Sequence, residues 1–178
     1  SVEATEAIEI ARQRVAKFIG APDAHDIVLT RNASESLNIV AKAFAPTVLK
    51  PGDEVCITIM EHHSNLIPWQ QACRDAGAKL VYLYPDEDGI IQPEEMDKKI
   101  GPKTKILSVV HVSNVLGVEN PVVELGRRVH EQGGYFVIDG AQSTPHIPVN
   151  VKELGADFFA LSAHKIFGPF GMGVLWGK

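Results

Sequence analysis

The chain has 178 residues, of which 45% are hydrophobic and 22% charged, as is ordinary for a globular domain with a sizeable core. Its formal net charge of -5 at pH 7 argues against a nucleic-acid or membrane partner, because both attract a basic face. No apolar run approaches the length of a membrane span, and the two cysteines form neither a disulfide framework nor a metal-binding spacing, so we expect a cytoplasmic protein.

The sequence predicts helices and strands that alternate along the whole chain. The first helix places one apolar stripe inward, formed by Ile8, Ala11, Val15, Phe18 and Ile19, and stops at Gly20. In chain order, the predicted elements are a helix at 3–19, strand 27–30, helix 34–44, strand 54–59, helix 65–76, strand 79–84, a short helix from 93, strand 105–111, helix 121–132, strand 135–139, a brief helix at 151–154, and strands 157–161 and 172–176.

These alternating elements predict an α/β fold with three layers and a mostly parallel, seven-stranded sheet. Neither a repeat nor a long linker interrupts the chain, so we expect residues 1–178 to form a single domain. The chain is helical almost from its first residue and ends just past an apolar strand. We therefore expect it to be a fragment of a longer protein.

Polar residues gather where four predicted strands end. The four clusters are Glu61, His62 and His63; Ser113, Asn114 and Gly117; Asp139, Gly140, Ala141 and Gln142; and Ser162, His164 and Lys165. Ligands of open α/β sheets bind beyond the carboxyl ends of the strands, and successive parallel strands point the same way. We therefore expect the four clusters to share one crevice.

Each cluster has a simpler interpretation when it is taken alone. Asp139 could cap a helix, and Asn114 could form a turn. The run that begins at Glu61 is typical of a solvated loop rather than a metal site, because no ligand spacing accompanies it. Only the coincidence of all four clusters at strand ends favours a functional site.

Residues 30–35 link a strand to the start of a helix. Free backbone N–H groups there, together with the Ser34 hydroxyl, could cradle an anion. Ordinary N-capping by Asn32 or Ser34 is locally the better explanation. The segment is not a P-loop, because it lacks the glycine and lysine pattern of one.

Lys165 is the most informative residue, because it follows an apolar strand and precedes a turn rich in Gly and Pro. A lysine at the end of a buried strand is costly unless its amine is used. One such use is a covalent bond to an aldehyde cofactor.

At these residues the chain resembles the cysteine desulfurases, which are class-V pyridoxal-phosphate (PLP) enzymes of the aminotransferase-like fold (fold type I). It is most similar to the group of SufS-type desulfurases and selenocysteine lyases. The resemblance extends over almost the whole chain. The stretches that match occur in the same order as in the family and are Met60–Gln70, His111–Pro121, Asp139–Gln142 and Ser162–Lys165. The resemblance implies a large PLP-binding domain.

The resemblance also implies a role for each site residue. Lys165 would hold PLP covalently and then move protons, and Asp139 would pair with the pyridine nitrogen. His62 would stack on the ring and assist proton transfer. The remaining cofactor-binding residues are implied to be Asn114 and Gln142 near the ring hydroxyl, and Ser34, Ser162 and His164 with the backbone near Ala33 at the phosphate.

Two positions depart from the pattern of the family. Ala33 stands where a hydroxyl residue is usual, so one side-chain bond to the phosphate would be missing. Asn32 stands where Gly is frequent, and Asn also tolerates left-handed backbone geometry.

The family's persulfide-forming cysteine and substrate-binding arginine come later than residue 178. Cys56 in a predicted buried strand and Cys73 on a helix are better interpreted as structural thiols. The resemblance thus implies a large domain without the small terminal domain, and a homodimer in the full-length protein.

The implied activity is PLP-dependent transfer of sulfur from L-cysteine, which gives L-alanine and an enzyme persulfide. The sulfur would then pass to an acceptor protein, for example in iron–sulfur cluster assembly. Three alternatives stay open at this point: a selenocysteine lyase acting on L-selenocysteine, an aminotransferase, and a non-catalytic scaffold domain.

Overall fold

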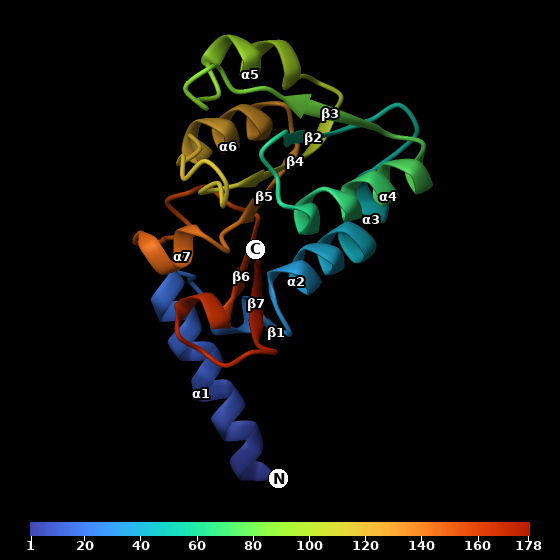
Figure 1. Ribbon diagram of the computed structural model, residues 1–178. Helices are drawn as coiled ribbons and strands as arrows, with labels where there is room; N and C mark the ends of the chain where they lie inside the picture. Colours follow the sequence, from blue (N-terminus) through green and yellow to red (C-terminus); the bar gives the residue numbers. More distant parts are fainter.

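The computed structural model describes residues 1–178 and has a seven-stranded sheet in the order β1-β7-β6-β5-β4-β2-β3 (Figure 1). The strands are β1 (Ile27–Thr30), β2 (Glu54–Thr58), β3 (Lys79–Leu83), β4 (Thr104–Val110), β5 (Tyr135–Asp139), β6 (Phe158–Ser162) and β7 (Gly173–Gly177). Strands β3, β2, β4, β5 and β6 are parallel, and β7 runs antiparallel to both β6 and β1. The predicted mostly parallel sheet of seven strands is confirmed.

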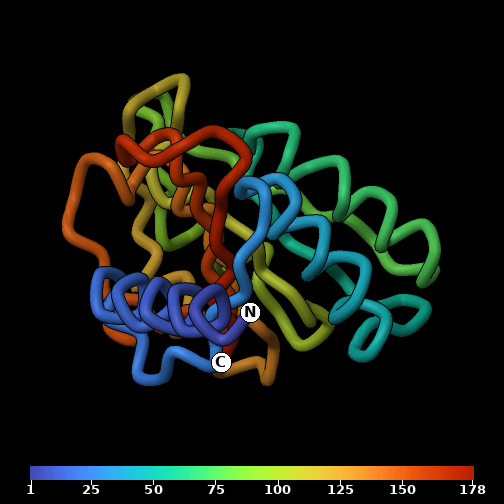
Figure 2. The backbone as a smooth tube through the Cα atoms, turned by 90° about the horizontal axis from the view of Figure 1, so that it is seen from below, coloured from blue at the N-terminus to red at the C-terminus, as the bar shows by residue number.

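Helices cover both faces of this sheet. They are α1 (Val2–Ile19), α2 (Ala33–Ile39), α3 (Ala45–Val48), α4 (Ile67–Ala76), α5 (Pro93–Lys99), α6 (Val122–Glu131) and α7 (Ser143–His146). Figure 2 shows the α2–α4 layer, in light blue to green, on one side of the molecule and the dark blue α1 away from it. The predicted three-layer arrangement is confirmed.

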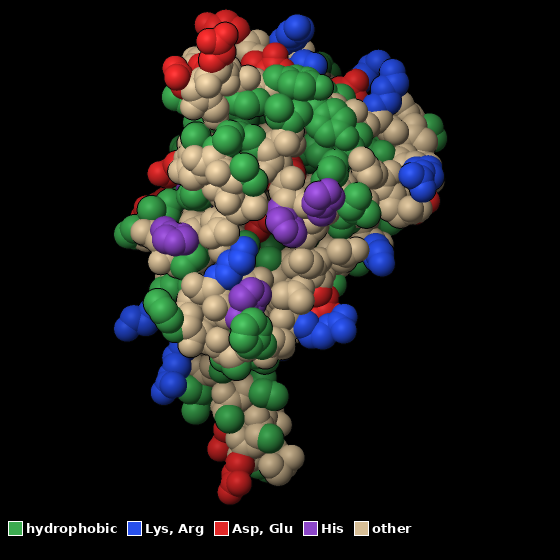
Figure 3. Space-filling model, viewed as in Figure 1, with side chains coloured by type: hydrophobic (Ala, Val, Ile, Leu, Met, Phe, Trp, Pro, Cys, Tyr) green, Lys and Arg blue, Asp and Glu red, His purple; other side chains and the backbone are tan.

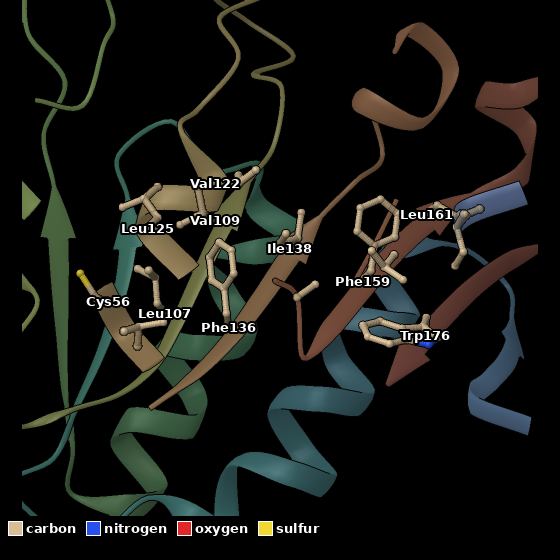
Figure 4. Close-up of a cluster of buried hydrophobic side chains, with 14 of the residues drawn as sticks. Cys56, Leu107, Val109, Val122, Leu125, Phe136, Ile138, Phe159, Leu161 and Trp176 are labelled. Carbon is tan, nitrogen blue, oxygen red and sulfur yellow. The ribbon is translucent and has the colours of Figure 1, made fainter. Parts of the chain in front are cut away.

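The side chains of the strands alternate between two hydrophobic clusters, as the period of two in a strand requires. Leu107, Phe136 and Ile138 point into the cluster beneath α6 (Figure 4). Ile106 and Val137, which neighbour them in the chain, pack instead against the α2–α4 layer. Because both faces are covered, the central strands are apolar almost throughout, which is typical of parallel sheets.

The sequence predicts one regular helix over residues 34–44, but the second half of this segment is π-helical over Val40–Phe44. The following helix α3 carries Pro46 in its first turn. Proline lacks an N–H to donate to the carbonyl four residues earlier, so the regular hydrogen-bond pattern cannot continue past it.

Two predictions about helices are wrong. Ile8 and Phe18 are expected inside, yet they are 45% and 55% exposed, because most of α1 projects from the body of the fold (Figure 1). The brief helix expected at residues 151–154 is a hydrogen-bonded turn, in which the Ala156 N–H donates to the carbonyl of Val151. None of the helices is long and apolar enough to cross a membrane.

Candidate active site at the carboxyl ends of the strands

A cavity of about 290 Å³ lies beyond the carboxyl ends of β4, β5 and β6. Its lining contains all the residues expected to bind the cofactor, namely Ala33, Ser34, His62, Asn114, Asp139, Gln142, Ser162, His164 and Lys165. Figure 3 shows histidine side chains gathered near the middle of one face of the molecule, beside a basic side chain and acidic atoms. The lining also contains Asn32 and Ala141, from two of the segments expected at the site, and Ser64 and Val110, which the sequence did not indicate.

A larger cavity of about 520 Å³ lies between α2, α3 and α4. Its lining includes His63 and Asp75, but neither a lysine at a strand end nor a buried carboxyl group. The smaller cavity is the better candidate, because its ionisable groups come from separate strand ends.

Asp139 ends β5 and is only 2% exposed. The backbone N–H of Ala141 donates a 3.0 Å hydrogen bond to Oδ1, and this is the one hydrogen bond of the carboxyl group within the chain. Burial raises the pKa of Asp139, while the hydrogen bond from Ala141 N–H and the electrostatic influence of Lys165 and His62 oppose that rise. The cavity therefore holds a buried acid with unused acceptor capacity.

Lys165 lies on the 3₁₀ turn Ala163–Ile166 that follows β6, and it is partly buried. The sequence placed it just beyond a strand that ends at residue 161, and the observed strand ends one residue later, at Ser162. The turn closes with Phe167 in the left-handed region (φ 63°) and with a bond from Gly168 N–H to the carbonyl of Ala163. This geometry directs the chain back into β7 and leaves Lys165 on the cavity wall.

The Glu61, His62 and His63 cluster is divided by the structure. His62 lines the smaller cavity and His63 the larger one. Nδ1 of His62 lies 2.8 Å from Oγ of Ser64 and accepts the Ser64 N–H at 3.1 Å. Glu61 lines neither cavity and turns inward, away from the solvated position that its sequence context suggested.

The expected anion loop is held by Asn32, which caps α2 by accepting the Glu35 N–H at 2.8 Å. Its φ of −176° is extended, so the turn does not use the left-handed geometry that Asn tolerates. The Ala33 N–H donates to Oγ of Ser162 at 2.9 Å. Ser34 is exposed, and its carbonyl oxygen accepts the bond from Asn38 Nδ2.

Asn114 lies in a hairpin closed by the bridge between Val112 and Glu119. Oγ of Ser113 accepts backbone bonds from Val115 and Leu116, which fixes the tight turn that carries Asn114. Ser113 is thus a structural residue of this loop rather than part of the cavity wall.

Two other lining residues complete the site. Gln142 immediately precedes α7, and its carbonyl oxygen lies 2.6 Å from Nδ1 of His146. The ring of His164 stacks on Phe170 at a centroid distance of 5.4 Å and an interplanar angle of 17°.

Neither cysteine has a reactive setting. Cys56 and Cys73 are 0% and 5% exposed, and neither lines the cavity near Lys165. Burial raises the pKa of Cys56 to about 12 and that of Cys73 to about 11. Both thiols are therefore protonated at neutral pH, which makes them poor nucleophiles. The His, Cys, Asp and Glu side chains form no group of three or more that could hold a metal ion.

Comparisons with known proteins agree on one family. The family model described as aminotransferase class-V matches residues 1–178. A probable cysteine desulfurase of Halalkalibacterium halodurans is 49% identical over 175 residues, which are 98% of this chain and 43% of the relative. A cysteine desulfurase of Haloferax volcanii is 49% identical over 179 residues, covering 100% of this chain and 42% of that protein.

A solved structure gives the same result for the fold. The apo cysteine desulfurase of Thermococcus onnurineus NA1 superposes with a TM-score of 0.94 at 45% identity, over 100% of this chain and 44% of that one. The chain thus spans less than half the length of the relatives that it matches.

Proposed function

Because the chain belongs to the class-V aminotransferase family, we propose that its parent protein is a PLP-dependent cysteine desulfurase. It takes sulfur from L-cysteine and releases L-alanine, and an enzyme thiol carries the sulfur as a persulfide. The cysteine desulfurase relatives, at 49% identity, favour this activity over the aminotransferase, selenocysteine lyase and scaffold alternatives.

The buried Asp139 carboxyl group is the observation that carries the proposal. It faces a cavity whose wall also holds Lys165 and His62, and its one internal hydrogen bond comes from Ala141 N–H. A buried carboxylate is costly without a cationic or donor partner. The protonated ring nitrogen of PLP is such a partner, so the residues present fit this cofactor.

The other lining residues complete the fit. Lys165 is the amine that would bond to the aldehyde carbon of PLP, and it would afterwards carry protons to and from the substrate carbon. His62, held by Ser64, would cover one face of the ring. When bound, PLP supplies an electron sink for the electron pair left on that carbon.

The phosphate would lie among the side chains around the start of α2. Ser34 is exposed there, and the Ser162 hydroxyl, which already accepts the Ala33 N–H, keeps its own proton to donate. His164 lines the same cavity, and Asn114 and Gln142 would contact the ring hydroxyl.

The sulfur-accepting thiolate belongs, in this proposal, to a part of the protein beyond these 178 residues. Cys56 and Cys73 are buried thiols with raised pKa values, and the relatives are more than twice as long as the matched region. We place these residues in the large domain of a two-domain chain. A homodimer, a cytoplasmic location, a sulfur-acceptor protein and a role in iron–sulfur cluster assembly are further parts of the same proposal.

The test is to titrate the purified chain with PLP and record the visible absorbance that PLP gains when a lysine bonds to its aldehyde. We expect this band in the wild type and its loss in Lys165→Ala. Circular dichroism should show that both proteins are folded. A wild type without the band, or a variant that keeps it, would refute the assignment of Lys165.

A second measurement concerns the missing thiolate. We expect little release of alanine or sulfide when the PLP-loaded chain is given L-cysteine, because neither of its thiols reaches the cavity. Rapid turnover by this chain would show that one of its own cysteines is the nucleophile.

A further inference from the structure

Glu61 stands immediately before His62, and hydrogen-bond donors surround its carboxyl group. Oε1 accepts the Thr58 hydroxyl at 2.6 Å and the Val110 N–H at 3.0 Å. Oε2 accepts Nδ2 of Asn65 at 2.5 Å. These bonds connect the loop after β2 to the end of β4, where Val110 lines the cavity.

Neither of the two N–H groups that donate to Glu61 can act as a hydrogen-bond acceptor in its place. One is the backbone N–H of Val110. The other is the amide of Asn65, whose Oδ1 already accepts from Trp69 Nε1 at 2.8 Å and from Ser108 Oγ at 2.7 Å. Indole nitrogen only donates, so the Asn65 oxygen must face Trp69 and its NH₂ group must face Glu61.

From this geometry we propose that Glu61 is a positioning residue, whose carboxyl group fastens the His62 loop to β4 and thereby sets the place of His62 on the cavity wall. The inference rests on the proposed function only for what His62 does there. Glu61 itself does not line the cavity near Lys165, so it would act through His62 and Val110 rather than on the substrate.

A neutral amide cannot replace this carboxyl group. In Glu61→Gln, the new NH₂ would face either the Val110 N–H or the NH₂ of Asn65, and each arrangement opposes two donors. The Thr58 hydroxyl, in contrast, can donate or accept. The carboxyl group can therefore take up a proton toward Thr58 while its heavy atoms keep their places.

The surroundings of Glu61 also shift its pKa, which makes its contribution to stability depend on pH. Burial raises the pKa of Glu61 to about 8, against the bonds from Thr58, Val110 and Asn65, and the charge of Asp139 raises it further. A folded pKa above the ordinary 4.5 means that the contribution of Glu61 to stability is present below pH 4.5 and is lost as the pH rises toward 8.

The experiment compares four forms of the chain: wild type, Glu61→Gln, Asn65→Asp, and the double variant that carries both changes. In the double variant the pair is reversed, because the amide introduced at position 61 would donate to the carboxylate introduced at position 65, which can still accept from Trp69 and Ser108. Glu95→Gln is the matched control, because Glu95 also accepts one backbone N–H, from Tyr84 at 3.1 Å, beside the edge strand β3 and outside the lining of the cavity near Lys165.

Two readouts are used, and one needs no cofactor. The imidazole proton resonance of His62 in the ligand-free chain reports the place of the loop, and a PLP titration reports the finished site. We expect each single variant to shift or broaden the His62 resonance and to raise the dissociation constant of PLP about tenfold. We expect the double variant to restore both, and Glu95→Gln to change neither.

The proposal is overturned if the His62 resonance is the same in Glu61→Gln as in the control Glu95→Gln. It is also overturned if the His62 resonance of the double variant is no closer to that of wild type than the resonances of the single variants are. A single variant that fails to fold still permits the comparison, since the double variant must then regain the fold and the wild-type resonance. Should PLP fail to bind even to the wild type, the proposed function falls, while the His62 resonance still decides the role of Glu61.

Discussion

The backbone N–H of Ala33 donates a 2.9 Å hydrogen bond to Oγ of Ser162, although 129 residues separate the two in the chain. The bond joins the start of α2 to the end of β6, and both residues are almost fully buried. The oxygen of Ser162 is thus engaged as an acceptor, and its hydroxyl proton can be donated into the cavity.

Ser162→Ala should consequently have two effects. The change leaves the Ala33 N–H buried without a partner, so the free energy of unfolding should fall by about 1–3 kcal/mol. It also removes a donor to the phosphate, so the dissociation constant of PLP should rise. Urea unfolding and PLP titration measure these effects separately.

Ser34→Ala is the matched control, because Ser34 is exposed on the same cavity wall. Its free energy of unfolding should stay within about 0.5 kcal/mol of wild type, while PLP binding weakens. Equal losses of stability in the two variants would contradict the assigned role of the bond between Ala33 and Ser162.

Asp139→Asn should stabilise the ligand-free chain at neutral pH and weaken its binding of PLP. Burial raises the pKa of Asp139 above 3.8, so its contribution to stability is present below pH 3.8 and is lost as the pH rises through the raised value. Asparagine keeps an oxygen for the Ala141 N–H and removes the buried charge. At pH 7 the gain in unfolding free energy should be about 1–3 kcal/mol.

Denaturant unfolding between pH 4 and pH 8 measures this effect, and the gain should shrink toward the acidic end. Asp53→Asn, in a partly exposed turn, is the control and should show no comparable gain. A variant that is less stable than wild type at pH 7 would mean that the Asp139 carboxylate is already well paired within the chain.

Gly173→Ala should damage both the fold and the anion loop. A Cβ atom at Gly173 would lie 2.4 Å from Cα of Asn32, and backbone at that distance can yield only if the start of α2 moves. Overpacking of this kind costs about 1–3 kcal/mol, and the shift should also raise the dissociation constant of PLP. Thermal unfolding and PLP titration provide the measurements.

Gly101→Ala serves as the comparison, because a Cβ there would meet no atom within 4 Å. Its stability should match that of wild type within about 0.5 kcal/mol. If Gly173→Ala were as stable as Gly101→Ala and bound PLP equally well, the close approach of β7 to the anion loop would have no role in the site.

The strands could be predicted from sequence because each is a short apolar run between turn residues, and such runs are specified locally. The first helix shows the limit of this reasoning. Its apolar stripe includes Ile8 and Phe18, but a helical period indicates only which face is apolar and not whether another element covers it. The prediction at 151–154 is wrong for a related reason, since one turn of helix and an isolated turn share the same local pattern.

Most residues of the candidate site could be predicted from topology, because the carboxyl ends of parallel strands lie at one edge of the sheet. Hydrogen-bond partners could not be predicted in this way. The bond between Ala33 and Ser162 spans 129 residues. Glu61 and His62 are adjacent in sequence but face opposite sides of their loop, and only the packing of Asn65 and Val110 decides this orientation.

Phe167 provides a test of strain beside Lys165. It is the one non-glycine residue with a positive φ, at 63°, and its side chain is fully exposed. Left-handed backbone costs an ordinary residue about 1–2 kcal/mol, and β-branched residues are genuine outliers there, whereas Asn adopts it more readily. Phe167→Val should therefore be less stable than Phe167→Asn by about 1–2 kcal/mol, although neither side chain has packing to lose. Chemical denaturation of the two variants measures this difference, and equal stabilities would show that the turn relaxes freely. If the turn relaxes freely, the visible absorbance band of PLP bound to Lys165 should also be the same in both variants. If the turn is strained, this band should differ from that of wild type in Phe167→Val alone.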